Sequence, residues 1–213
     1  MFEDRKDAGI KLGKSLKKYQ GEHPIIIGIP RGGIETAFYV AEELHAELVP
    51  VISKKLGYPL NPEFAIGALA EDGSLYLSPW VNSEISSLEL EEIKNKALEE
   101  IKRRVQLLRK GEPIPQLNDR TVIVVDDGIA TGSTLFTTLE LCKKQHPKKL
   151  IVAAPISGRE AELQLKKMAD EVLILEIPED FRAVSQGYQR FSNLTDEETL
   201  GFLRKHEKVI SSH

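Results

Sequence analysis

The sequence predicts an α/β fold, in which a doubly wound and mainly parallel five-stranded sheet carries helices on both faces. Five short apolar runs rich in β-branched residues alternate with segments of helical periodicity, as expected when parallel strands are joined by helical crossovers. This alternation is interrupted once, at about residues 57–118, and a polar tail at about residues 178–213 follows the last strand. We therefore expect a single domain over residues 1–213, with residues 57–118 as an insertion and residues 178–213 as a small C-terminal hood.

The first part of the chain predicts a β-α-β unit. Residues 24–30 (PIIIGIP) and 47–53 (ELVPVIS) have the composition of buried strands, and residues 34–46 between them have apolar residues at helical spacing. The segment before this unit resembles an amphipathic helix, with Ala8, Leu12 and Leu16 among charged residues. A β-α-β unit favours a parallel sheet, because its crossover returns the second strand in the direction of the first.

The insertion predicts different elements. Residues 64–78 alternate loosely around Asp72-Gly73, a dipeptide typical of tight turns, which indicates a hairpin. Residues 83–111 predict a long amphipathic helix that ends at Gly111 and the prolines after it. Its apolar stripe consists of Leu90, Ile93, Ala97, Ile101, Val105 and Leu108. The i,i+4 pairs Glu99/Arg103 and Glu100/Arg104 are expected on its solvated side.

The parallel pattern resumes after the insertion. The expected elements are a strand at 121–126, a helix at 133–145, a strand at 149–156, a helix at 159–169, a strand at 171–177 and a helix near 195–208. Ligands of doubly wound sheets bind beyond the carboxyl ends of the strands, where the strand order reverses. Candidate functional residues are therefore sought where each strand ends.

Composition limits the function classes. The net charge of −4 argues against a general nucleic-acid binder, which normally presents a basic face. A single cysteine, Cys142, allows no intramolecular disulfide and no cysteine-based metal site, so we expect a cytoplasmic protein. No apolar run approaches the length that spans a bilayer, and no membrane role is expected.

The stretch VIVVDDGIATGST, residues 122–134, joins a buried strand to a helix through two carboxylates and a Gly/Thr-rich turn. Amides at a helix N-terminus bind anions, and glycine lets the backbone approach a phosphate closely. The carboxylates of Asp126 and Asp127 can accept hydrogen bonds from hydroxyl groups beside that anion site. Together they suit a phosphorylated sugar, although DDG taken alone is better explained by a helix-capping turn with two surface aspartates. A P-loop lysine is absent, and GIPRGG (28–33) lacks the spacing of a dinucleotide-binding loop.

This stretch resembles the signature of the type I phosphoribosyltransferases: four apolar residues, two acidic residues, then G-x-x-T-G-x-T. DRKDAG (4–9), GIPRGG (28–33), NPEFAIGALAEDG (61–73) and VDDGIATGST (125–134) occur in the order seen in a poorly characterised branch of that family. The resemblance covers about residues 2–200. It implies Mg²⁺-dependent transfer of the phosphoribosyl group of 5-phosphoribosyl 1-pyrophosphate (PRPP) to an acceptor, usually a nucleobase, with release of pyrophosphate.

The resemblance assigns roles at the first loop. Asp126 and Asp127 would hold the ribose hydroxyls, and one of them could act as general base. The 5′-phosphate would be bound by Gly128, Ala130, Thr131, Gly132, Ser133 and Thr134. Mg²⁺ would be held mainly by PRPP oxygens, with one of the two carboxylates as a further ligand, since this ion keeps much of its hydration shell.

The resemblance also implies a pyrophosphate site. Arg31, Gly32 and Gly33 would form its loop, which in many relatives contains a non-proline cis peptide. Lys54 and Lys55, after the second strand, are candidates to reach the pyrophosphate, and the sequence leaves open which of them points inward. A Gly-rich turn with solvated basic residues is the competing interpretation of both segments.

Two further groups are weaker candidates. Arg103, Arg104 and Arg109 lie in the insertion, where the family has a mobile flap, but a solvated helix face is the better explanation for at least one of them. Phe181, Tyr188 and Phe191 in the hood are candidates to stack on the acceptor; packing of the tail is the alternative that we favour for two of the three.

Two functions are carried forward. The leading one is a phosphoribosyltransferase of nucleotide salvage whose acceptor the sequence does not name. The alternative is a regulator that senses PRPP or nucleotides with the same fold. Homodimers are common in the family, although the sequence carries no interface signature.

Overall fold

The computed structural model describes residues 1–58, 61–79, 81 and 85–211. It contains a five-stranded sheet in the order β2-β1-β6-β7-β8, and all four strand pairings are parallel. These strands are β1 (Ile25–Gly28), β2 (Glu47–Pro50), β6 (Thr121–Val125), β7 (Lys149–Ile156) and β8 (Glu171–Glu176). The predicted fold class is confirmed, because each expected strand is present and the order reverses between β1 and β6.

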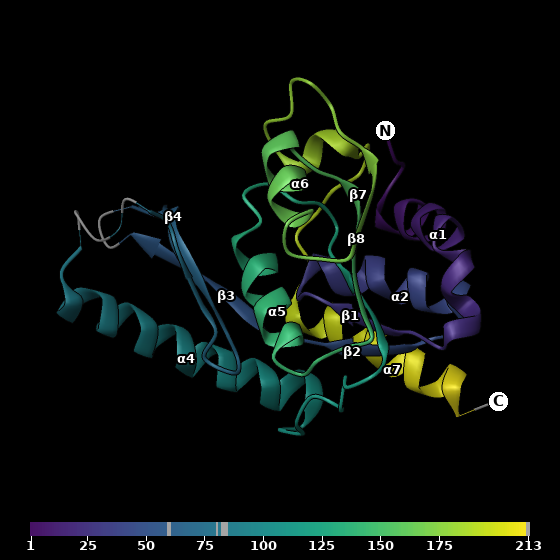
Figure 1. Ribbon diagram of the computed structural model, residues 1–213, viewed down its shortest axis with the longest axis horizontal. Coiled ribbons are helices and arrows are strands. Elements are labelled where there is room, and N and C mark those ends of the chain that lie inside the picture. The colour runs from purple at the N-terminus through teal and green to yellow at the C-terminus, as the bar shows by residue number, and fades with distance from the viewer. Residues whose placement is uncertain (59–60, 80, 82–84, 212–213) are drawn as a thin grey trace.

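Helices cover both faces of this sheet (Figure 1). They are α1 (Arg5–Ser15), α2 (Gly32–Leu44), α5 (Ser133–Lys143), α6 (Arg159–Leu165) and α7 (Asp196–Ile210). Alternate residues of each strand point to opposite faces. Thus Ile26 and Ile123 pack in one core with α1, α2 and α7, whereas Ile27 and Val124 pack in the other with α5 and α6.

The insertion forms a second sheet and the long helix α4 (Ser87–Arg109), which extend to the left in Figure 1. The predicted hairpin is present, because β4 (Asn61–Ala70) and β5 (Leu75–Leu77) pair antiparallel on either side of Asp72-Gly73, and β3 (Ser53–Tyr58) adds a third antiparallel strand to this sheet. The predicted strand 47–53 was wrong in its extent, because the first sheet ends at Pro50 and Ser53 already pairs with Ala70 in the second. Lys54 and Lys55 therefore lie on a strand of the second sheet.

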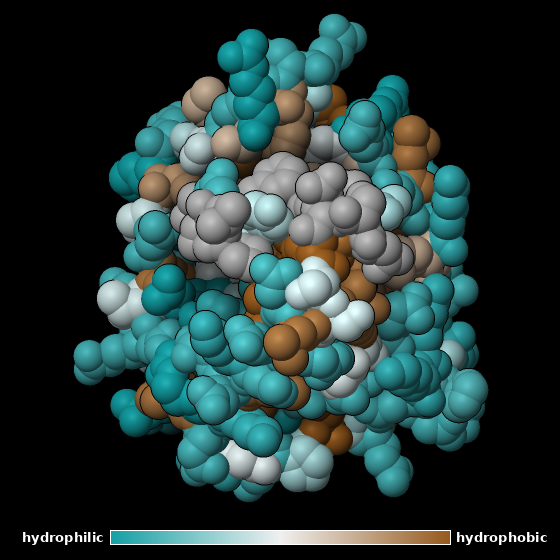
Figure 2. Space-filling view, turned by 90° about the vertical axis from the view of Figure 1, so that its left-hand side faces the viewer, coloured by the Kyte–Doolittle hydropathy of each residue, from teal (hydrophilic) through white to brown (hydrophobic). Residues whose placement is uncertain are grey.

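Helix α4 has the predicted apolar stripe, of which Ala97, Ile101 and Leu108 are buried. Ser86 caps the helix reciprocally with Glu89, so it begins at Ser87; the first residues predicted for it, 83 and 84, lie outside the described residues. The predicted pair Glu100/Arg104 is present, but Arg103 pairs with Glu100 and not with Glu99. Mostly hydrophilic side chains cover the side of the molecule from which the insertion projects (Figure 2).

The described residues also include two short 3₁₀ helices: η1 (Lys17–Glu22) and, within the hood, η2 (Val184–Gly187). The hood is joined to the N-terminal segment through Phe2, whose N–H donates to the Gly187 carbonyl and whose carbonyl accepts from the Gln189 N–H. None of the helices in the described part of the chain has the length and hydropathy that a bilayer-spanning segment needs.

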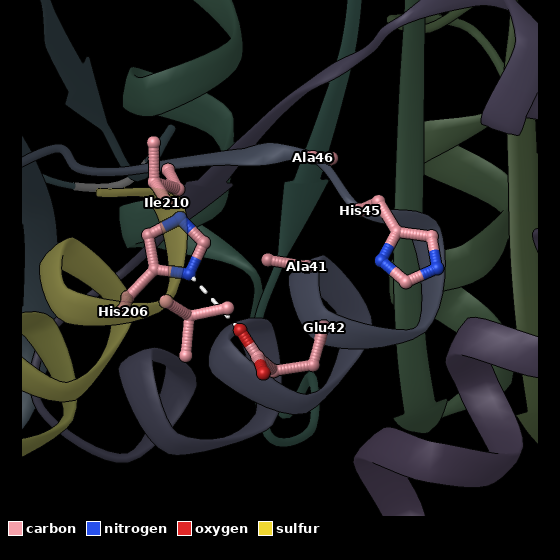
Figure 3. A pocket seen from close by; sticks show the side chains of 7 residues that line it. Ala41, Glu42, His45, Ala46, His206 and Ile210 are labelled. Atoms are coloured by element: carbon pink, nitrogen blue, oxygen red, sulfur yellow. Dashed lines mark hydrogen bonds and ion pairs between the residues drawn. The ribbon is translucent and has the colours of Figure 1, made fainter. Parts of the chain in front are cut away.

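Helix α7 is held to the sheet through His206, which is only 5% exposed. Its Nε2 atom accepts a hydrogen bond of 3.1 Å from the N–H of Leu48 in β2, and Nδ1 lies 3.3 Å from a carboxylate oxygen of Glu42 (Figure 3). The ring borders a hollow of about 660 Å³ between α2 and α7, at whose edge His45 is exposed. The N–H of Leu48 therefore depends on a side chain from α7 for its hydrogen bond.

Replacement of His206 by alanine should lower the free energy of unfolding by about 1–3 kcal/mol, because the Leu48 N–H would stay buried without an acceptor. Urea denaturation of His206→Ala measures this loss. His45→Asn is the matched control: it alters a histidine of the same hollow at an exposed left-handed position that asparagine tolerates, and should change stability by less than about 0.5 kcal/mol. Equal losses in both variants would contradict the assigned hydrogen bond.

Candidate functional site

The candidate site lies where β1 and β6 end. These strands are neighbours, and their register pairs Gly28 with Val125, so the loops that follow them leave the sheet side by side. One loop carries Arg31 to Gly33, and the other carries Asp126 to Gly132. The structure thus brings together the two segments that the sequence singled out most strongly.

The loop after β6 encloses a cavity of about 160 Å³ at the start of α5. Gly132 caps this helix with φ 78°, and a Cβ atom there would lie 2.8 Å from the Phe136 ring, so the position requires glycine. The first turn of α5 offers amides that have no partner within the helix. The loop residues that line the cavity are Gly128, Ile129, Ala130, Thr131, Gly132, Ser133, Thr134 and Leu135. A small cavity with amide and hydroxyl donors suits an anion.

The two carboxylates differ in their surroundings. Asp126 accepts a hydrogen bond of 2.9 Å from the Asp127 N–H through Oδ1. Removal of its carboxyl group from water, together with the neighbouring Asp127 carboxylate, raises the pKa of Asp126 well above its ordinary value. Asp127 instead forms an ion pair of 2.7 Å between its Oδ2 and Nε of Arg5. Asp126 therefore holds a proton more readily than an ordinary aspartate.

Arg5, in α1, is a residue of this site that the sequence analysis did not assign. It is only 5% exposed, donates a second hydrogen bond of 2.8 Å to the Ser192 carbonyl, and lies 3.9 Å from Glu35. Burial is the main reason that the pKa of Glu35 is raised. The available signal was the segment DRKDAG, which contains Arg5 and belongs to the resemblance. The partners of Arg5 are far away in sequence, so no local pattern could have identified them.

The loop after β1 packs directly on the acidic pair. Its Pro30–Arg31 peptide bond is cis, as the resemblance implies. A Cβ atom on Gly32 would lie 2.0 Å from Oδ2 of Asp127, and one on Gly33 would lie 2.7 Å from Oδ1 of Asp126. Both glycines are therefore needed for this close approach. They also belong to the first turn of α2, which begins earlier than the predicted residue 34.

Of the two lysines, Lys55 lines the cavity above the β6–α5 loop, together with Asp126 and Val184. Lys54 lines the groove of about 540 Å³ between β3 and α4. The hydrogen bond from Arg103 is the main reason that the pKa of Glu100 is lowered to about 2, and the charge of Lys54 contributes to this shift. Lys55 borders this groove as well. Lys55 is thus the lysine of this pair that faces the loop.

The three arginines of α4 lie in different surroundings. Arg103 donates to Asp196 over 2.8 Å, and Nη1 of Arg31 lies 4.0 Å from the other oxygen of the same carboxylate, so Arg103 is brought near the loop after β1. Arg104 is paired with Glu100. Arg109 forms a bidentate pair with Glu71 and donates to the Pro50 carbonyl, away from the acidic pair.

The three candidate aromatic residues of the hood also lie in different surroundings. Tyr188 is buried and donates a hydrogen bond from its hydroxyl to the Asp127 carbonyl, while its ring packs against Phe2 and Phe191. The Phe191 ring lies under the Arg5 guanidinium, with Cζ 4.1 Å from the ring centroid. Phe181 lines a hollow of about 620 Å³ that is shared with Ala130 and Thr131. Two of the three rings thus pack around the Arg5–Asp127 pair, and Phe181 borders open space beside the loop.

The chain is similar to known proteins over most of its length. Residues 5–189 match the model of the phosphoribosyl transferase domain. A protein of Mycobacterium tuberculosis (strain H37Rv), assigned to the phosphoribosyl transferases by prediction, is 36% identical over 205 residues, which are 95% of this chain and 46% of the relative. The chain therefore matches these curated relatives over nearly all of its own residues, but it spans only about half of their length.

Among solved structures, the crystal structure of TT1426 from Thermus thermophilus superimposes with a TM-score of 0.80 at 36% identity, covering 96% of this chain and 98% of that one. A uracil phosphoribosyltransferase of Thermococcus sibiricus is 42% identical over 77 residues, 35% of this chain and 33% of its own. The domain match covers most of the residues, including both loops of the site. The chain belongs to the phosphoribosyl transferase family.

Proposed function

We propose that this protein transfers the 5-phosphoribosyl group of PRPP to a nitrogen of a nucleobase and releases pyrophosphate. The observation that supports it best is the cavity beside Asp126, in which acceptors for hydroxyl groups adjoin the amides and hydroxyls of the β6–α5 loop. A sugar phosphate presents the complementary groups. Residues 1–213 would act as one domain for this purpose, in a cytoplasmic setting that suits the buried free thiol of Cys142.

In the proposed complex, Asp126 and Asp127 accept hydrogen bonds from the ribose hydroxyls. The 5′-phosphate lies against the loop, bound by Gly128, Ala130, Thr131, Gly132, Ser133 and Thr134. The pyrophosphate lies against the first turn of α2, where Arg31, Gly32 and Gly33 supply amides and a cation. Lys55 and Arg103 are the further cations that we assign to it, since Lys55 borders the cavity and Arg103 shares Asp196 with Arg31.

The donor set is compatible with Mg²⁺ that arrives with PRPP. Within the described residues, no three His, Cys, Asp or Glu side chains cluster as a metal site, whereas the two adjacent aspartates could supply one or two ligands. Either carboxylate could provide such a ligand, with Oδ1 as the oxygen of Asp127 that Arg5 leaves unpaired. This donor set suits an ion that keeps its water and is held chiefly by phosphate oxygens. When bound, it would neutralise charge on the departing pyrophosphate.

The proposed reaction is a displacement at the anomeric carbon. A base nitrogen forms the new bond to this carbon while the bond to the pyrophosphate oxygen breaks, and pyrophosphate leaves with the electron pair. Carboxylates beside the ribose favour the positive charge that develops on the sugar ring. Asp126 is the stronger candidate for general base, because its raised pKa makes it a better proton acceptor than an ordinary aspartate, whereas Asp127 is paired with Arg5.

The acceptor is proposed to enter from the side of the hood. Phe181 borders the hollow next to Ala130 and Thr131, which makes its ring the best placed of the hood aromatics to contact a flat base. A nucleobase acceptor is further supported by the similarity of part of the chain to a uracil phosphoribosyltransferase.

The function is tested by measuring pyrophosphate release from PRPP and Mg²⁺ with purine and pyrimidine bases added one at a time. Release should depend on one base, because the base nitrogen is the nucleophile. Reactions without a base measure hydrolysis and serve as the control. Protein that binds PRPP but releases no pyrophosphate with any base would contradict the transferase and favour a PRPP-sensing regulator.

Replacement of Asp126 by asparagine should reduce kcat by about 10²–10⁴-fold. The fold should survive, because the amide oxygen can still accept from the Asp127 N–H. In the unmodified protein the needed carboxylate is lost as pH falls through its raised pKa, so activity should decline at a higher pH than an ordinary aspartate would give. A pH–rate profile measures this acid limb, which should vanish in Asp126→Asn; an unchanged limb would assign the titration to another group.

Lys55 should contribute to PRPP binding more than Lys54. Loss of one hydrogen bond to a charged group costs about 1.5–3 kcal/mol, so Lys55→Met should raise the KM for PRPP by about 10- to 100-fold. Lys54→Met is the matched control, with a neighbouring cation removed from the groove beside α4, and should change KM by less than about twofold. Initial rates measured at varied PRPP concentrations give the KM of each variant, and equal increases in KM would contradict the assignment of Lys55.

A further inference from the structure

The contacts of Arg5 join three parts of the chain at one carboxylate. Its Nε–H donates to Oδ2 of Asp127 over 2.7 Å, and its Nη1 donates to the Ser192 carbonyl over 2.8 Å. Its Cζ atom lies over the ring of Phe191, 4.1 Å from the centroid. Arg5 itself belongs to α1, whereas Ser192 and Phe191 belong to the hood. The orientation of one Asp127 oxygen is thus set by a side chain that α1 and the hood hold in place.

The charges around Arg5 give this contact a further consequence. The Asp127 carboxylate raises the pKa of both Asp126 and Glu35, and Arg5 is the cation that lowers both pKa values against the effect of burial. A buried arginine without its carboxylate partner is costly, and so is a cluster of carboxylates without a cation. Arg5 therefore both compensates the charge of Asp127 and fixes its position.

The position of Asp127 is fixed from two other sides as well. The Tyr188 hydroxyl donates to its backbone carbonyl, and Gly32 packs so closely that an added Cβ atom would meet both Oδ2 of Asp127 and Nε of Arg5. With Oδ2 engaged by Arg5, Oδ1 is the oxygen left to accept from a ligand. Asp127 remains partly exposed, with 15% of its side chain accessible.

We propose that Arg5 is a positioning residue, which orients Asp127 so that its second carboxylate oxygen accepts a hydrogen bond from a ribose hydroxyl. This inference rests on the proposed function. Lysine could not replace Arg5 fully, because a single ammonium group lacks the planar fork that donates to Asp127 and Ser192 while stacking on Phe191. The site is accordingly completed by α1 and the hood, which contain neither of its two glycine-rich loops.

The test compares binding of ribose 5-phosphate with binding of inorganic phosphate, measured by calorimetry. Both ligands engage the loop at the start of α5, but only the sugar phosphate presents hydroxyls to Asp127. Arg5→Met should weaken ribose 5-phosphate binding at least tenfold and leave the phosphate dissociation constant within twofold of the unmodified protein. Arg190→Met is the matched control: Arg190 also joins the hood to the N-terminal segment, through exposed pairs of 2.8 Å with Glu3 and Asp4, but has no contact with Asp127.

Arg5→Lys decides the outcome if Arg5→Met does not fold, because it keeps the charge. It should retain phosphate binding and lose most of the advantage that ribose 5-phosphate has over phosphate. Wild-type affinity for ribose 5-phosphate in Arg5→Lys, or in a folded Arg5→Met, would overturn the positioning role and leave the proposed function intact. Equal weakening by Arg190→Met would reduce the role to general attachment of the hood. Absence of ribose 5-phosphate and PRPP binding in the unmodified protein would instead refute the proposed function.

Discussion

The parallel pairing of β1 with β6 is the constraint on which the site depends. Because the strand order reverses between them, α2 and α5 leave toward opposite faces while their N-terminal ends meet at one edge. The Ile29 N–H still donates to the Val125 carbonyl, so the two backbones separate only after the strands have ended. Two helix N-termini, each with free amides and the positive end of its dipole, then face the same space. A ligand with two anionic ends is the natural complement of that arrangement.

The same edge concentrates negative charge that must be balanced within the protein. Asp126 and Asp127 follow a strand that is buried throughout, and the glycines after β1 press against both carboxylates. The two acids are balanced differently. Arg5 compensates Asp127 directly, whereas Asp126 is left with a raised pKa and a tendency to retain a proton. The two adjacent residues of this motif thereby differ in their chemistry, because their partners lie elsewhere in the chain.

Local sequence patterns predicted most of the fold, because the strands of the parallel sheet are continuous apolar runs and the stripe of α4 is strictly periodic. They failed at β3, whose residues SKKLGY carry little β-branched character and are held by pairing with β4. They also failed where the partner of a charge is remote: Arg109 pairs with Glu71, and Arg103 pairs with Asp196. The glycine-rich loops were predictable because backbone approach demands specific residues, whereas Arg5 was not, because its role arises only from the tertiary structure.

The remote contacts of Arg5 have a consequence for how the molecule is made. Arg5 is separated by 122 residues from Asp127 and by 187 from Ser192, so the ion pair and its carbonyl partner close very long loops. Because the hood follows every strand of the parallel sheet in the sequence, the contacts of Arg5 with Ser192 and Phe191 can form only after those strands have been synthesised. During synthesis the parallel sheet can therefore form before the hood residues that contact Arg5 are available. The Asp127 carboxylate would then acquire its final orientation only after the residues up to Ser192 have been synthesised.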